Sequence, residues 1–80
     1  MLIAMTLPHY KEEPKAVAPL LVGALEDPEA RVRITAAESL GQLGPIALEA
    51  IPALTRALKD DHARVREQAE KALELIRNKR

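Results

Sequence analysis

A heptapeptide occurs twice in this 80-residue chain, and the second copy follows the first by 33 residues. Residues 27–33 (DPEARVR) return as residues 60–66 (DDHARVR). A fixed period in this range is typical of repeat proteins, in which each unit packs only against its neighbours. Within residues 14–80 the same offset relates six further identical pairs: Pro19 and Pro52, Leu21 and Leu54, Ala24 and Ala57, Leu25 and Leu58, Ala36 and Ala69, Leu40 and Leu73.

The first unit predicts two helices. Apolar residues recur at helical spacing from about residue 15 to 26, and Pro14 suits the start of a helix. Asp27 is expected to be the N-cap of the second helix and Pro28 its first residue. Gly44-Pro45 should end that helix, because glycine accepts a left-handed cap and proline prevents continuation. The expected core positions are Val17, Leu20, Leu21, Ala24, Leu25, Val32, Ala36, Leu40 and Leu43.

The second unit repeats this pattern. Pro45 should open a helix that leads to Asp60, and Asp60 should cap a last helix that runs to a basic tail with Arg77, Lys79 and Arg80. The fold class is therefore all-α, with two antiparallel helix pairs in residues 14–44 and 45–80 and no strands. The expected core positions of this unit are Ile46, Ile51, Leu54, Leu58, Val65, Ala69, Leu73 and Ile76.

Residues 1–13 form an apolar N-terminal segment with two interpretations. At the offset of 33, Ile3, Leu7 and Tyr10 fall on three core positions of the first unit, so this segment fits a partial helix of a preceding repeat. Pro8 lies inside that stripe and opposes a long helix, because it lacks a backbone N–H and clashes one turn back. The alternative is a frayed apolar arm.

The composition excludes several classes of function. Twelve acidic residues balance twelve basic ones, so no net charge draws the chain to nucleic acid or to an anionic membrane. Tyr10 is the only aromatic residue, and there is no cysteine. The apolar start of the chain has no basic residue and is too short for a signal peptide or a membrane span. We expect a cytoplasmic protein without a nucleic-acid or membrane partner.

No group of residues predicts chemistry. His9 and His62 have no partner at helical spacing that could complete a metal site. Asp60 and Asp61 are explained by a helix N-cap and first turn, and Ser39 lacks the histidine and aspartate of a nucleophilic triad. We therefore expect no catalytic, cofactor-binding or metal site, and we expect a protein that is not an enzyme.

A helix ending in Ala-Leu, followed by Asp, by Arg-Val-Arg and by Ala and Leu at helical spacing, resembles the HEAT repeat. The Leu-Gly-Pro between the units and the proline in each first helix resemble the bacterial HEAT-like repeats of the phycocyanobilin-lyase type. This resemblance covers residues 14–77 and implies an α-solenoid whose curved surface binds other proteins. It also implies a structural ladder between neighbouring units, formed by Asp27 with Arg33 and by Asp60 with Arg66. We expect Arg66 to be partly buried, because it follows a core position.

The leading functional hypothesis is a non-enzymatic scaffold for protein–protein interaction. The alternative is a subunit or relative of a bilin lyase, and a nucleic-acid-binding helical repeat is third. The candidate binding face is a polar ridge on the second helix of each unit, in which Glu38 should lie beside Lys71; the alternative is an ordinary solvated surface. The polar ridge comprises Arg31, Thr35, Glu38, Gln42, Arg64, Gln68, Lys71 and Leu75.

The two units differ in a way that predicts assembly. Three residues on one face of the first unit become glutamates in the second: Ile34 and Glu67, Ala37 and Glu70, Gly41 and Glu74. Because a terminal unit needs a polar outer face, the second unit should cap the stack at its C-terminal end. The N-terminal end stays apolar, so we expect a homodimer joined there, with residues 1–10 in the contact. The candidate contact residues are Leu2, Ile3, Met5, Leu7, Tyr10, Val17 and Leu21.

Overall fold

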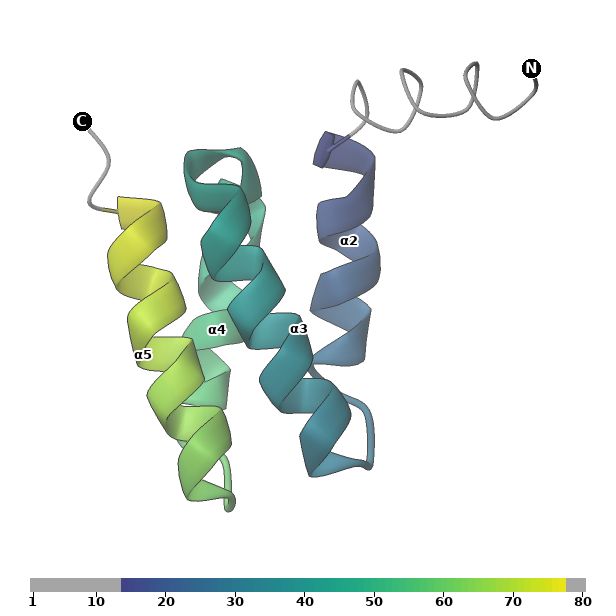
Figure 1. Ribbon diagram of the computed structural model, residues 1–80, viewed down its shortest axis with the longest axis vertical. Coiled ribbons are helices and arrows are strands. Elements are labelled where there is room, and N and C mark those ends of the chain that lie inside the picture. Colours follow the sequence, from purple (N-terminus) through teal and green to yellow (C-terminus); the bar gives the residue numbers. More distant parts are fainter. Residues whose placement is uncertain (1–13, 78–80) are drawn as a thin grey trace.

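The structure, a computed structural model, describes residues 14–77, with side chains from residue 17 onward. All its elements are helical, which confirms the predicted all-α class: α2 (Pro14–Ala24), α3 (Ala30–Leu43), the 3-10 helix η1 (Gly44–Ala50), α4 (Ile51–Ala57) and α5 (Ala63–Arg77). Helices α2 and α3 form the first pair, and η1 with α4 forms the second pair with α5 (Figure 1). Within the described range, no helix has the length and apolarity that crossing a membrane requires.

The core is made of small aliphatic side chains. Leu40, Leu54, Val65 and Ile76 are its largest fully buried members, and no polar side chain of the described range is buried. Helices α3 and α5 share the most extensive contact between elements and lie side by side (Figure 1). They approach closely at Gly41, where an added Cβ would lie 3.0 Å from the Cα of Ala72. The predicted core stripe of α5 (Val65, Ala69, Leu73 and Ile76) is confirmed.

Two predicted core positions of the first unit are wrong. Leu20 is 74% exposed, because α2 packs against α3 and η1 with another face, on which Ala18 is buried. Val32 is 38% exposed, because it lies at the N-terminal edge of the stack and no described helix covers it. The remaining expected positions of this unit are buried or half-buried.

The predicted single helix after Pro45 is also wrong. The chain forms η1 and then α4, and Ala47 interrupts the helical backbone with φ −97° and ψ 28°. A 3-10 helix has 3.0 residues per turn instead of 3.6, so the side chains that face the core change. Ala47 and Ala50 are buried, whereas the predicted core residue Ile46 is 43% exposed. Gly44 ends α3 with a positive φ of 65°, but its ψ of −141° lies outside the left-handed helical region, so the predicted left-handed cap does not form.

The two aspartates do not serve as helix N-caps, which corrects both predicted helix starts. Helix α3 begins at Ala30, and α5 begins at Ala63. Each aspartate instead closes a turn just before its helix: Oδ1 of Asp27 accepts the N–H of Glu29 at 2.8 Å, and Oδ1 of Asp60 accepts the N–H of His62 at 2.9 Å. Such side-chain turns compete with helical hydrogen bonds, which delays each helix by about two residues.

Candidate protein-binding surfaces

One guanidinium joins the turns of the two units. Arg33 donates from Nε to Oδ2 of Asp60 at 2.8 Å and from Nη2 to Oδ1 at 3.1 Å. Its Nη1 donates to the carbonyl oxygens of Asp27 at 2.8 Å and Pro28 at 3.0 Å. Arg33 therefore fixes its own turn and binds the next turn through a two-point contact with a carboxylate, which sets the orientation of the neighbouring unit.

The Arg33–Asp60 pair is largely shielded from solvent, since the two side chains are 18% and 14% exposed. Burial raises the pKa of Asp60, but the hydrogen bond from Arg33, the N–H of His62 and the positive charge of Arg33 outweigh it. The net effect is a pKa below the ordinary value of an aspartate. The carboxylate is thus held ionised as a structural group.

The second ladder arginine makes a smaller contact. Arg66 donates from Nη1 to the carbonyl oxygen of Asp60 at 2.6 Å, and its side chain is exposed rather than partly buried as predicted. No carboxylate of a following unit lies beside it within the described residues. The carboxylate of Asp27, at the other end, accepts the N–H of Glu29 and forms no ion pair with an arginine in that range.

The structure divides the predicted polar ridge. Five of its members line a shallow groove between α3 and α5, about 220 Å³ in volume, together with Ala37, Gly41 and Ala72. Those five are Glu38, Gln42, Gln68, Lys71 and Leu75. Glu38 and Lys71 line the same groove as predicted, but no ion pair joins them in the described part of the chain.

The other three members of the ridge lie elsewhere. Arg31 and Thr35 border a second groove, between α2 and α3, and the Thr35 hydroxyl donates to the carbonyl oxygen of Arg31 at 3.0 Å. Arg64 is exposed and lines neither groove. The eight residues therefore do not form one continuous binding face.

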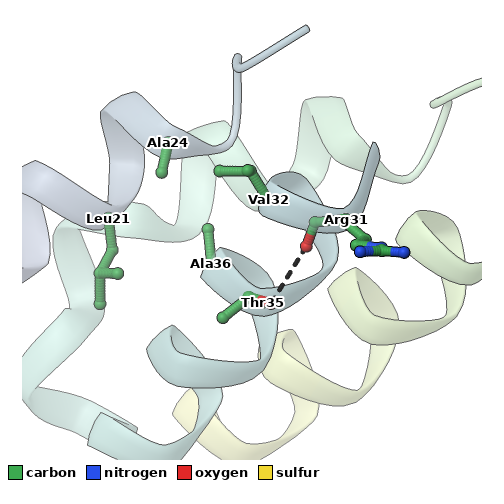
Figure 2. Close-up of a pocket in the computed structure, with 6 residues that line it drawn as sticks. All are labelled: Leu21, Ala24, Arg31, Val32, Thr35 and Ala36. Carbon is green, nitrogen blue, oxygen red and sulfur yellow. Dashed lines mark hydrogen bonds between the residues drawn. The ribbon is translucent and has the colours of Figure 1, made fainter. Parts of the chain in front are cut away.

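The apolar groove between α2 and α3 was only partly foreseen from the sequence. This edge groove has a volume of about 390 Å³ and is lined by Leu21, Ala24, Arg31, Val32, Thr35 and Ala36. Figure 2 shows that Leu21 and Ala24 from α2 approach Val32 and Ala36 from α3, while the Arg31 guanidinium points away from them. Leu21 and Val17, which were predicted as contact residues, are half-buried. The predicted contact residues 2–10 lie outside the described residues.

The described side chains offer no metal site, since no group of three or more histidine, aspartate or glutamate residues is placed to hold an ion in residues 14–77. The exposed His62 lies in the turn before α5. The arrangement thus provides two grooves and a charged ladder.

Comparison with known proteins supports the interpretation of the repeat. A family model for HEAT repeats matches residues 1–74, which include the described helices up to the last turn of α5. No curated protein and no solved structure matches the chain. Because the match spans most of the sequence and the structure shows two successive helix pairs, the chain belongs to the HEAT-repeat family.

Proposed function

We propose that this chain is a non-catalytic module for protein–protein interaction, acting as a scaffold in the cytoplasm. HEAT repeats commonly bind proteins, because stacked helix pairs present extended surfaces to a partner. A sequence without cysteine is compatible with a reducing compartment. The observation that carries the proposal is the edge groove.

The edge groove suits a helix better than a small molecule. Its apolar side chains come from two helices, and they lie open at the N-terminal edge of the stack. Sites for small molecules usually add precisely placed polar groups that orient the ligand. Here the Arg31 guanidinium points away from the apolar residues, and the Thr35 hydroxyl already donates to a backbone carbonyl. A groove of this kind accepts the apolar stripe of a helix.

Self-association through this edge is part of the proposal. The opposite edge is polar, because Glu67, Glu70 and Glu74 are exposed on α5. The corresponding face of α3 is partly or wholly buried, and Gly41 on it packs against α5. An open apolar edge and a polar edge on one chain favour a homodimer that closes by joining its two N-terminal edges, with residues 1–10 in the contact.

Because the homodimer would cover the edge groove, a heterologous protein partner would use the groove between α3 and α5, which five residues of the polar ridge line. To test this, the wild-type chain is immobilised, proteins from the source cell are captured and identified, and the affinity of the purified partner is measured. Lys71→Glu should weaken that affinity by at least about tenfold, since it reverses a charge in the groove. The matched reversal Glu49→Lys, on η1, should leave it unchanged. Equal affinities for both variants would reject this surface.

A further inference from the structure

The edge groove is exposed where the equivalent surface of the second unit is covered. At the offset of 33, Val32 corresponds to Val65 and Leu21 to Leu54. Val65 and Leu54 are 0% exposed, whereas Val32 is 38% exposed and Leu21 is half-buried. The second unit differs because the first unit is stacked against it, with the most extensive contact between α3 and α5. Within the described residues no element covers the edge groove in this way, so the groove suits a surface from a second molecule.

The α5 edge of a second copy cannot cover the groove in the way that α3 covers α5. Gly41 on α3 lies so close to α5 that an added Cβ would lie 3.0 Å from the Cα of Ala72. The counterpart of Gly41 on α5 is Glu74, which carries both a Cβ and a carboxylate. Glu67 and Glu70 are exposed on the same face of α5. A second copy that enters the groove would therefore present its own N-terminal edge, which is apolar.

Helix α3 carries the charges that such a self-complementary contact requires. In a two-fold interface, residue i contacts residue j of the second copy, and j contacts i. Arg31 and Glu38 are seven residues apart, which is close to two helical turns, so they lie nearly in line along α3. Both side chains are exposed, and neither forms an ion pair within the described residues. Figure 2 shows that the Arg31 guanidinium is directed away from the apolar residues of the groove, which leaves it accessible to a carboxylate of another molecule.

An antiparallel pair of α3 helices brings these charges together. With the two-fold axis beside Thr35, Arg31 of each copy lies opposite Glu38 of the other copy. The same pairing places Val32 of each copy beside Ala36 of the other, and both residues line the edge groove. The Thr35 hydroxyl at the centre already donates to the carbonyl oxygen of Arg31 at 3.0 Å. The contact therefore has an apolar centre with a pair of opposite charges at each end.

We propose that two copies pack α3 against α3 in antiparallel orientation, with Arg31 of each copy paired to Glu38 of the other. The proposal rests on the homodimer of the proposed function and adds the register of its contact. A single two-fold axis closes both edge grooves and leaves the glutamates of α5 outside. The charges at the two ends select this register, because any other alignment of the helices brings Arg31 away from its partner carboxylate.

Charge reversal tests the pairing, with the dissociation constant of the dimer measured by sedimentation equilibrium. Arg31→Glu places a glutamate opposite Glu38, and Glu38→Arg places an arginine opposite Arg31. Each variant should raise the dissociation constant at least about tenfold, because like charges across an interface repel. The controls are Arg64→Glu, at the position of α5 that corresponds to Arg31, and Glu70→Arg, on the polar edge. Both controls should leave the dissociation constant unchanged.

An equimolar mixture of the two variants gives the sharper result. In a dimer of one Arg31→Glu chain and one Glu38→Arg chain, each pair again has opposite charges. The mixture should therefore form a heterodimer about as tightly as the wild type forms its homodimer, at a concentration where neither variant dimerises alone. Native mass spectrometry identifies the heterodimer, because the two variants differ in mass. Recovery on mixing also shows that both variants are folded.

The outcomes separate this contact from the homodimer itself. A monomeric wild-type chain would reject both. A dimeric wild type that neither Arg31→Glu nor Glu38→Arg weakens would overturn the α3 contact and leave the proposed homodimer standing. Two weakened variants that do not recover on mixing would show that Arg31 and Glu38 are not partners, and they would overturn the α3 contact as well.

Discussion

Arg33 and Arg66 occupy the same position in the two units, but they have different structural roles. Arg33 binds both oxygens of the Asp60 carboxylate and two carbonyl groups of its own turn. Arg66 makes one hydrogen bond, to a carbonyl of its own turn, and remains exposed. The contact with Asp60 depends on the neighbouring unit, because within the described residues only Arg33 has a following helix pair. In a repeat protein the role of a residue therefore depends on where its unit lies in the stack.

The largest expected effect concerns positions at which the two units are alike. Leu40→Ala and Leu73→Ala should each lower the free energy of unfolding by about 2–5 kcal/mol, because each removes a buried side chain and leaves a cavity. Chemical denaturation measures both values. Leu20→Ala is the control, since that residue is exposed, and it should change stability by less than about 0.5 kcal/mol. A similar loss for Leu20→Ala and Leu40→Ala would contradict the register of the first unit.

The next effect separates the two ladder arginines. Arg33→Ala should cost about 1–3 kcal/mol, because it leaves the shielded carboxylate of Asp60 without its main partner. Arg66→Ala should cost less than about 1 kcal/mol, since an exposed group with one hydrogen bond contributes little. Thermal melts of the two variants under the same conditions provide the comparison. Equal losses would show that the inter-unit contact adds nothing beyond the local turn.

Two glycines extend the comparison to backbone packing. Gly41→Ala should be destabilising, because overpacking against the α5 backbone costs about 1–3 kcal/mol and exceeds the gain of about 1 kcal/mol in helix propensity. Gly23→Ala should stabilise by about 0.5–1 kcal/mol, because open space surrounds this helical position. Melting temperatures should thus shift in opposite directions. A stabilising Gly41→Ala would indicate that α3 and α5 pack less closely than the structure shows.

The smallest effect is a dependence of stability on pH. The pKa of Asp60 is lower in the folded chain than in the unfolded one. Its contribution to the free energy of unfolding is therefore present above the unfolded-state pKa of about 4, and it is lost as the pH falls through the folded-state pKa. The wild type should therefore lose more stability than Asp60→Asn between about pH 5 and pH 2. Denaturation at a series of pH values measures this, and parallel curves would exclude Asp60 as a source of the dependence.

The repeat made the fold predictable, but the neighbours of each unit were harder to infer. The all-α class and the buried stripe of α5 follow from periodicity, and the HEAT-repeat family follows from the resemblance of the repeated motif; all three are confirmed. The phycocyanobilin-lyase type stays a prediction. Val32 was misplaced because its pattern is the same as that of Val65, and periodicity does not show whether a covering helix is present. Ile46 was misplaced because we predicted one α-helix after Pro45, with 3.6 residues per turn, whereas residues 44–50 form a 3-10 helix.

The mass of the particle in solution tests the central claim, that the apolar N-terminal edge is an interaction surface and the polar edge is a cap. Light scattering after size exclusion, at high micromolar concentration, should give twice the chain mass for the wild type and for Glu70→Lys on the polar edge. Val32→Glu, in the edge groove, and Ile3→Glu/Leu7→Glu, in the N-terminal segment, should give a monomer or unfold the chain. A wild-type chain that is a stable, monodisperse monomer under these conditions would contradict the claim.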